Sequence, residues 1–311
     1  MRGGSAPSRS PQTSSRDRSA LVRFAVGAVR PRYRRPVPEG AIDPGTAVLL
    51  GVVQGVTEFL PISSDGHLAV AALVAGETAP SLALVVLLHV GTLAATLLVF
   101  RAEVRALVAS LASGMRAPRA YLETVEGRTN LAIVVATVPT ALVGLALRDA
   151  VEAWARVPWI VGGCLLGTAA AVGSTFWTGP RAHRPDTALS PRDALLVGLA
   201  QGLAVLPGLS RSGTTIAAAV ALGTVAPAAF RLSFLLSLPA VFGAVLLELR
   251  HPSEVLATLG PAALLGAAVS FVVGLGALLG LRRLVDGGRF WVFAVYLVPL
   301  GLVLLAWRPA P

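Results

Sequence analysis

A short stretch near the start of the chain concentrates side chains that can do acid, base and nucleophilic chemistry. It reads QGVTEFLPISSDGH and carries, in order, Gln54, Glu58, Ser63, Ser64, Asp65 and His67. Ionisable side chains are costly in apolar surroundings, and where they gather there they usually serve function. The stretch is therefore a candidate active site, although single polar residues in such surroundings more often serve helix packing.

A second stretch, PGLSRSGTT, supplies chemistry suited to phosphate. Arg211 stands there among hydroxyl groups and a glycine, namely Ser210, Ser212, Gly213 and Thr215. An arginine fork binds two phosphate oxygens at once and stays charged at any relevant pH. We therefore expect Arg211 to bind an anionic ligand. The alternative is that Arg211 pairs with Glu58 or Asp65 and only joins two parts of the fold.

The local structure expected around the first stretch also favours phosphate. Pro61 should end one helix, and Ser63 or Ser64 should cap the next, so that backbone N–H groups face a ligand. Gln54 and Glu58 are four residues apart and share one helix face, where they can hold a cation or a water together. A hydrogen-bonded pair between helices is the simpler alternative.

The rest of the sequence excludes several chemistries. It contains no lysine, so mechanisms that need a lysine amine or a P-loop lysine are excluded. The single cysteine, Cys164, can form neither a disulfide within the chain nor a cysteine metal cluster. His89 is alone on an apolar segment, and a lone histidine is more often a buried hydrogen-bonding residue than a catalyst.

The composition places both stretches in a membrane protein. Of 311 residues, 55% are hydrophobic and 14% are charged, and the mean hydropathy is +0.74. Those values are far too apolar for an ordinary soluble domain. The isoelectric point near 11.4 does not indicate a nucleic-acid partner, because nine arginines crowd into the first 35 residues. We expect residues 1–40 to be a disordered tail and residues 41–311 a single membrane-embedded domain.

Two kinds of apolar segment follow the tail. Six have the roughly 20 apolar residues that a transmembrane helix needs, at about 81–100, 131–147, 159–177, 232–248, 258–281 and 290–307. Regions 46–76 and 194–223 are interrupted by Pro, Gly, Ser and charged residues, which predicts broken or re-entrant helices. The predicted fold is an all-α polytopic membrane protein with about six full transmembrane helices and two broken helical motifs.

Arginine counts predict the orientation, because cytoplasmic loops keep an excess of positive charge. Loops 101–130, 178–193 and 282–289 carry five, three and three arginines, against two, one and one in 148–158, 249–257 and 308–311. The first group should face the cytoplasm, and the first motif should open to the outer face. This orientation puts the arginine-rich tail outside, against the same rule, unless region 46–76 crosses the membrane fully.

The two broken regions are related by an internal repeat. A shift of 147 residues aligns Gly51, Gln54, Gly55, Ser63 and Gly66 with Gly198, Gln201, Gly202, Ser210 and Gly213. With the predicted orientation, repeat halves at about 46–147 and 194–281 are inverted. Inverted repeats commonly bring broken helices together near the membrane midplane, with their amino-terminal ends toward an anionic ligand. We therefore expect one composite site built from both motifs.

At these motifs the sequence resembles the undecaprenyl-diphosphate phosphatase family, the bacitracin-resistance phosphatases of bacterial membranes. Family members carry (E/Q)GxTEFLPxSSxGH and then PGxSRSGxT, which stand here as QGVTEFLPISSDGH and PGLSRSGTT. The stretch FRLSFLLSLPAVFGA at 230–244 is also similar to the family. The resemblance covers roughly residues 46–307 and excludes the tail.

The resemblance implies hydrolysis of undecaprenyl diphosphate to undecaprenyl phosphate and inorganic phosphate at the bacterial plasma membrane. This reaction recycles the lipid carrier for peptidoglycan synthesis and confers bacitracin resistance. The implied catalytic core is Glu58, Ser64, His67 and Arg211. The implied substrate-binding residues are Gln54, Ser63, Asp65, Ser210, Ser212, Gly213 and Thr215. A divalent cation, Mg or Ca, could bind through Glu58 and the phosphates.

Two departures from the family pattern bear on the cation. The family often has Glu where this chain has Gln54, which weakens a metal site made of two carboxylates. Asp65 stands where Ser or Thr is usual and can restore the missing charge. The type-2 phosphatidic acid phosphatases also use Ser-Gly-His and Ser-Arg elements, but they begin with a lysine motif that a chain without lysine cannot have.

The sequence leaves the nucleophile open. Ser64 activated by His67 is preferred, because a hydroxyl needs a neighbouring base to attack. The alternatives are His67 itself, or a water polarised by Glu58 and a metal. A second hypothesis is a transporter, either a polyprenyl-phosphate flippase or an ion-coupled carrier, as inverted repeats with midplane charges suggest. A transporter needs no nucleophile beside a base, so the SSDGH cluster favours the enzyme. The expected partners are the lipid substrate and membrane lipids, with the oligomeric state open.

Overall fold

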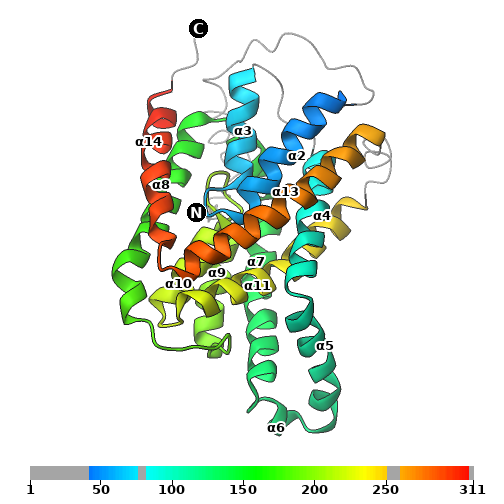
Figure 1. Cartoon of the computed structure of the whole chain (residues 1–311), viewed down its shortest axis with the longest axis vertical. Coiled ribbons are helices and arrows are strands. Elements are labelled where there is room, and N and C mark those ends of the chain that lie inside the picture. The colour runs from blue at the N-terminus through cyan, green and yellow to red at the C-terminus, as the bar shows by residue number, and fades with distance from the viewer. Residues whose placement is uncertain (1–41, 76–81, 251–259, 308–311) are drawn as a thin grey trace, which may run out of the picture. The chain divides into compact units, whose positions relative to one another are not determined.

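The computed structural model describes residues 42–75, 82–250 and 260–307, and the predicted tail, residues 1–40, lies outside them. The described residues form helices joined by turns, with one isolated bridge between Arg184 and Thr224. The all-α prediction is confirmed. In chain order (Figure 1) the helices are α2 (Pro44–Phe59), α3 (Ser64–Ala75), α4 (Leu82–Val99), α5 (Arg101–Arg116), α6 (Pro118–Tyr121), α7 (Val125–Trp154), α8 (Pro158–Thr178), α9 (Pro191–Leu203), α10 (Arg211–Ala221), α11 (Ala226–Glu248), α13 (Pro261–Asp286) and α14 (Phe293–Ala306), with 3-10 turns at Gly179–Arg181 and Phe290–Val292.

Several helices have the length and composition of membrane spans. Among the described residues four qualify alone, in α7, α8, α11 and α13, and a fifth qualifies if α4 and α5, bent by 78° at their junction, count as one. The apolar helix at Phe290–Ala306 is shorter. The chain is thus a multi-pass membrane protein, but the predicted count of six full spans is not confirmed. Exposed Val134, Val138 and Leu142 give α7 an apolar outer face suited to lipid.

The prediction of a loop at 101–130 was wrong. It contains the amphipathic helix α5, the short helix α6 and the start of α7, with α5 and α7 side by side (Figure 1). This charged segment between two predicted spans was interpreted as a loop. Its alanines, leucines and arginines are nonetheless strong helix formers, and Val104 and Leu107 of α5 pack against the hydrophobic core.

Both predicted helix breaks are present. Helix α2 ends at Phe59, two residues before Pro61, and α3 begins at Ser64 after Ser63, whose φ is 70°. Helix α9 ends at Leu203, and α10 begins at Arg211 after a turn that contains Gly208 with φ 105°. Positive φ is costly for serine and easy for glycine. The first break therefore holds a strained residue next to the candidate site.

The two broken helices begin at positions 147 residues apart in both of their parts. Helices α2 and α9 start at Pro44 and Pro191, and α3 and α10 start at 64 and 211. The first pair also has matching caps: the Asp43 carboxylate accepts from the Thr46 N–H at 2.9 Å, and the Ser190 hydroxyl accepts from the Asp193 N–H at 3.1 Å. Both helices therefore begin with a side-chain N-cap at the equivalent position.

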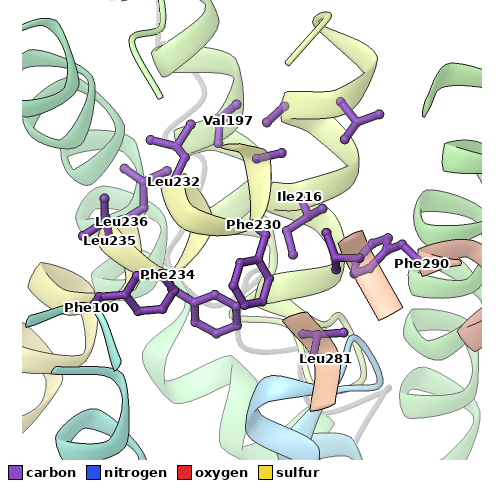
Figure 2. Packing of buried hydrophobic residues seen from close by; sticks show 14 of the residues in the cluster. Phe100, Val197, Ile216, Phe230, Leu232, Phe234, Leu235, Leu236, Leu281 and Phe290 are labelled. Atoms are coloured by element: carbon purple, nitrogen blue, oxygen red, sulfur yellow. The ribbon is translucent and has the colours of Figure 1, made fainter. Parts of the chain in front are cut away.

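A buried aromatic cluster fixes the end of α2 (Figure 2). The rings of Phe230 and Phe234 on α11 lie 4.8 Å apart, and Phe100 lies 5.8 Å from Phe234. Phe59, the last residue of α2, adds its ring at 5.7 Å from Phe234 and is fully buried. Aromatic side chains bury large areas with specific geometry. This cluster thus anchors the residue next to Glu58.

Equivalent glycines let each broken helix cross a long helix at backbone distance. A Cβ atom at Gly51 of α2 would lie 2.4 Å from the Gly266 carbonyl oxygen of α13. A Cβ atom at Gly198 of α9 would lie 2.5 Å from Ala136 of α7. Real Cβ contacts are never so short, so only glycine permits these two crossings.

Replacing Gly51 or Gly198 with Ala should therefore destabilise the protein. The added methyl would push two backbones apart, at a cost of about 1–3 kcal/mol for overpacking. Thermal unfolding in detergent measures the effect. Gly163 of α8 is a matched control, because nothing lies within 4 Å of its Cβ position. Equal melting temperatures for all three variants would show that the crossings are not tight.

Candidate active site

The two helix breaks meet face to face. A Cβ atom at Gly66 would lie 3.0 Å from the Cα of Gly208, so the two turns touch at their backbones. The Ser212 hydroxyl donates to the Phe59 carbonyl oxygen at 3.2 Å, which joins the start of α10 to the end of α2. The expectation of one composite site from both motifs agrees with this contact.

Glu58 is the centre of the site. Its Oε1 accepts a hydrogen bond from Arg211 Nη2 at 2.5 Å, an ion pair between the two motifs. Its Oε2 accepts from the Ser64 hydroxyl at 2.8 Å and from Gln54 Nε2 at 3.2 Å. Glu58 is buried, and buried carboxylates persist only when paired and hydrogen-bonded. The structure thus brings together four residues from the two predicted motifs.

His89 completes the surroundings of Glu58 and was not foreseen. Its Nε2 lies 3.2 Å from Glu58 Oε2, although α4 belongs to neither motif. The sequence favoured a structural role because a histidine on an apolar segment shows no local partner. Its distance of 31 positions from Glu58 in the chain gave no helical spacing to reveal the contact.

Arg211 keeps unused binding capacity. Its Nη2 holds Glu58, but its Nη1 is buried and has no hydrogen-bond partner among the described residues. A buried donor without a partner is costly, and such exceptions often mark functional positions. This nitrogen is therefore ready for an anionic ligand. The predicted pairing of Arg211 with Glu58 is present, and the binding of an anionic ligand by Arg211 stays a prediction.

The serines that precede α3 and α10 cap them in the same way. The Ser63 hydroxyl accepts from the Gly66 N–H at 3.3 Å, and the Ser210 hydroxyl accepts from the Gly213 N–H at 3.1 Å. Each cap fixes the first turn of a helix whose amino-terminal end carries partial positive charge. Both helix starts therefore suit a phosphate group, as the sequence predicted.

The remaining predicted residues lie around this centre. The Thr215 hydroxyl donates to the Arg211 carbonyl oxygen at 2.7 Å and lies 2.6 Å from the Ser233 hydroxyl, so it holds the first turn of α10. Asp65 is exposed and interacts electrostatically with His89, Glu58 and Arg211. Its carboxyl group thus lies at the border of the site.

A further support comes from α8. The Thr168 hydroxyl donates to the Gly208 carbonyl oxygen at 2.8 Å and accepts from the Ser210 N–H at 2.9 Å. Thr168 is fully buried and bridges both ends of the turn before Arg211. The sequence gave no signal for this role, because a threonine in an apolar helix commonly bonds only to its own backbone.

The hydrogen bonds of the His67 ring, among the described residues, go to groups other than the Ser64 hydroxyl. Its Nδ1 lies 2.8 Å from the Ser63 carbonyl oxygen, and its Nε2 lies 2.8 Å from the Tyr296 hydroxyl of α14. A carbonyl oxygen only accepts, so Nδ1 carries the proton and Nε2 accepts from Tyr296. The structure therefore pairs Ser64 with Glu58 and not with the histidine that the sequence favoured. Tyr296, 229 positions away, was not anticipated.

The donors around Glu58 do not fit a resident divalent cation. Oε1 faces the cationic Arg211, and Oε2 faces the donors Ser64, Gln54 and His89. Two basic groups beside one carboxylate oppose a further positive charge. Among the described residues, no three His, Cys, Asp or Glu side chains converge as a ligand set. The protein alone thus offers no preformed Mg or Ca site here.

Comparison with known proteins agrees with the motifs. Residues 47–303 match the family described as bacitracin resistance protein BacA. An undecaprenyl-diphosphatase of Desulfosudis oleivorans is 42% identical over 276 residues, covering 85% of this chain and 98% of that protein. An undecaprenyl-diphosphatase of Korarchaeum cryptofilum is 41% identical over 262 residues, covering 84% and 97%. One of Mycolicibacterium smegmatis is 36% identical over 264 residues, covering 83% and 94%.

These similarities extend over nearly the full length of each relative and over every described helix from α2 to α13. The resemblance that the two motifs indicated is confirmed, and the chain belongs to the bacitracin resistance protein BacA family.

Proposed function

We propose that this chain hydrolyses undecaprenyl diphosphate to undecaprenyl phosphate and inorganic phosphate. The reaction would return the lipid carrier to peptidoglycan synthesis and confer bacitracin resistance. The relatives named undecaprenyl-diphosphatase support the assignment. The observation that carries it is the contact of Glu58 with both Arg211 and Ser64, which sets a phosphate-binding fork beside a hydroxyl and its base.

Substrate binding would use Arg211 and the two helix starts. The free Nη1 of Arg211 supplies one donor, and the partial positive charges of α3 and α10 supply further attraction for phosphate oxygens. Phosphoryl transfer depends mainly on positioning and on spreading charge over those oxygens. Ser210, Ser212, Gly213 and Thr215 would act by shaping the start of α10, and Ser63 by shaping that of α3.

For the nucleophile we propose Ser64 with Glu58 as its base. The Ser64 hydroxyl already donates to Glu58 at 2.8 Å, within the reach that proton transfer needs. Its Oγ would attack the terminal phosphorus while its proton passes to Glu58, and the bond to the bridging oxygen would break to release undecaprenyl phosphate. Water would then hydrolyse the phosphoserine to give inorganic phosphate and restore Ser64.

His67 has a different part in this proposal from the one that the sequence suggested. Both its ring nitrogens have partners, in Ser63 and Tyr296, so it is not free to take the Ser64 proton. We assign it to holding the start of α3 against α14. A divalent cation, Mg or Ca, would enter as a counter-ion of the diphosphate, with Gln54 Oε1, which lacks a described partner, as one protein ligand.

A lipid-phosphate flippase or an ion-coupled transporter is the second candidate. The paired helix breaks favour it, because transporters commonly bind substrates between such helices. A carrier would bind and release phosphate through Arg211 without any chemistry at Ser64. The contact between Ser64 and Glu58 therefore favours hydrolysis.

Purified full-length protein in detergent should release inorganic phosphate from undecaprenyl diphosphate. Release would be measured with and without added Mg or Ca, since the cation requirement belongs to the same assay. Binding of the lipid without any phosphate release under either condition would favour the transporter instead.

The matched variants for this assay are Arg211→Lys and Arg231→Lys. Lysine keeps the charge but loses the planar fork, so the first change should lower phosphate release by about 100-fold, the scale of misplacing a reacting group. Arg231 is exposed, belongs to neither motif and donates to the Pro185 carbonyl oxygen, so its change should leave release unaltered. Similar activity in both variants would reduce Arg211 to a structural counter-ion.

We further propose that the protein lies in the bacterial plasma membrane with its site open to the outer face. The arginine excess in 101–130, 178–193 and 282–289 supports this orientation. An outward site would meet the carrier on the side where its cargo has been delivered.

Cysteine labelling tests the orientation. In a Cys164→Ala background, a cysteine at Gly260, where nothing lies within 4 Å of the Cβ position, should react with a membrane-impermeant thiol reagent in intact cells. A cysteine at the exposed Arg119 of α6 should react only after the cells are permeabilised. The reverse pattern would overturn the outward orientation and leave the reaction itself in place.

A further inference from the structure

His89 lies outside both sequence motifs but contacts the centre of the site. It stands on α4, which packs against α2, α11 and α13. Its Nε2 lies 3.2 Å from Glu58 Oε2, and its side chain is 20% exposed. The contact therefore joins a fourth helix to the one carboxylate that α2, α3 and α10 share.

The ring is fixed by its other nitrogen. His89 Nδ1 lies 2.8 Å from the Val85 carbonyl oxygen one turn earlier in α4. The Val85 carbonyl oxygen and the ionised Glu58 carboxylate can only accept hydrogen bonds. Both ring nitrogens of His89 therefore donate, and the ring is an imidazolium. Thr92 in turn donates to the His89 carbonyl oxygen at 3.0 Å. The bond from Nδ1 to Val85 orients the ring so that Nε2 points to Glu58.

The two basic partners of Glu58 occupy different oxygens. Arg211 holds Oε1 through one nitrogen of a fork whose other nitrogen has no partner among the described residues, whereas His89 holds Oε2. A diphosphate with several negative charges would compete with Glu58 for Arg211. His89 cannot follow the phosphate, because its ring is tied to α4. Oε2 is also the oxygen that accepts from the Ser64 hydroxyl.

A buried carboxylate that loses its only strong partner is costly and tends to move. Resting on the proposed hydrolysis, we propose that His89 is a positioning residue for the reaction: its fixed Nε2–H donor keeps Glu58 aimed at Ser64 when Arg211 turns to the substrate phosphate. Arg211 then binds the substrate phosphate, and His89 keeps the Glu58 base in position. Loss of His89 should lower kcat and leave KM nearly unchanged.

Steady-state phosphate release by full-length variants separates this role from a structural one. His89→Leu fills a similar volume without a donor, and its kcat should fall by about 100-fold, with KM within about 3-fold of the parent. His89→Gln restores an N–H donor and should recover kcat to within about 10-fold. His183→Leu, at an exposed histidine, is the control and should match the parent.

Three results would overturn the inference. They are a leucine variant with parental kcat, a glutamine variant no better than leucine at equal melting temperature, and a rise in KM in place of the fall in kcat. If the leucine variant does not fold, His89→Met supplies the same comparison. A parent protein that releases no phosphate would overturn the proposed function and this inference together, whereas an active parent with an unaffected leucine variant would overturn only the inference.

Discussion

The ion pair between Glu58 and Arg211 is the interaction on which the site depends. It joins residues 153 positions apart, from the ends of two separately broken helices, at 2.5 Å. In an apolar interior a charge is costly without a partner of opposite sign, and these two side chains supply one another with such a partner. The pair therefore ties the position of each helix break to that of the other. A ligand that displaces Glu58 from Arg211 must supply negative charge and hydrogen-bond acceptors in its place.

The surrounding fold makes this pair possible in three ways. The glycine crossings at Gly51 and Gly198 hold the broken helices against α13 and α7. The Phe59 ring fixes the end of α2 in an aromatic cluster with Phe234. Thr168 bridges the turn that presents Arg211. Close-packed interiors transmit small displacements. A shift at any of these contacts should therefore be passed on to the Glu58 carboxylate.

The sequence predicted the parts of this site that local rules govern. Proline and serine at the helix breaks, polar residues at four-residue spacing and the 147-residue repeat all act over short or regular distances, so α2, α3, α9 and α10 could be placed. Helical character in 101–116 was missed because the segment was assigned as the connection between two predicted spans. The span count is not confirmed, because α14 is shorter than the helices that qualify alone.

Contacts across long stretches of chain could not be predicted. His89 and Tyr296 reach the two motifs only through the packing of α4 and α14, which no periodicity encodes. The expected pairing of Ser64 with His67 was wrong for a related reason. The pairing was expected because a hydroxyl needs a neighbouring base, but after the turn at Ser63 the Ser64 hydroxyl bonds to Glu58 and the His67 ring to Tyr296.

The most direct test of the account is a double-mutant cycle on unfolding free energy in detergent, with Glu58→Gln, Arg211→Leu and the double variant. If the two side chains form one buried pair, each single change removes a charged partner of the side chain that remains. The double change should then cost less than the sum of the singles by about 1–3 kcal/mol. Additive costs, within about 0.5 kcal/mol, would contradict the claim that the two helix breaks share a single ion pair.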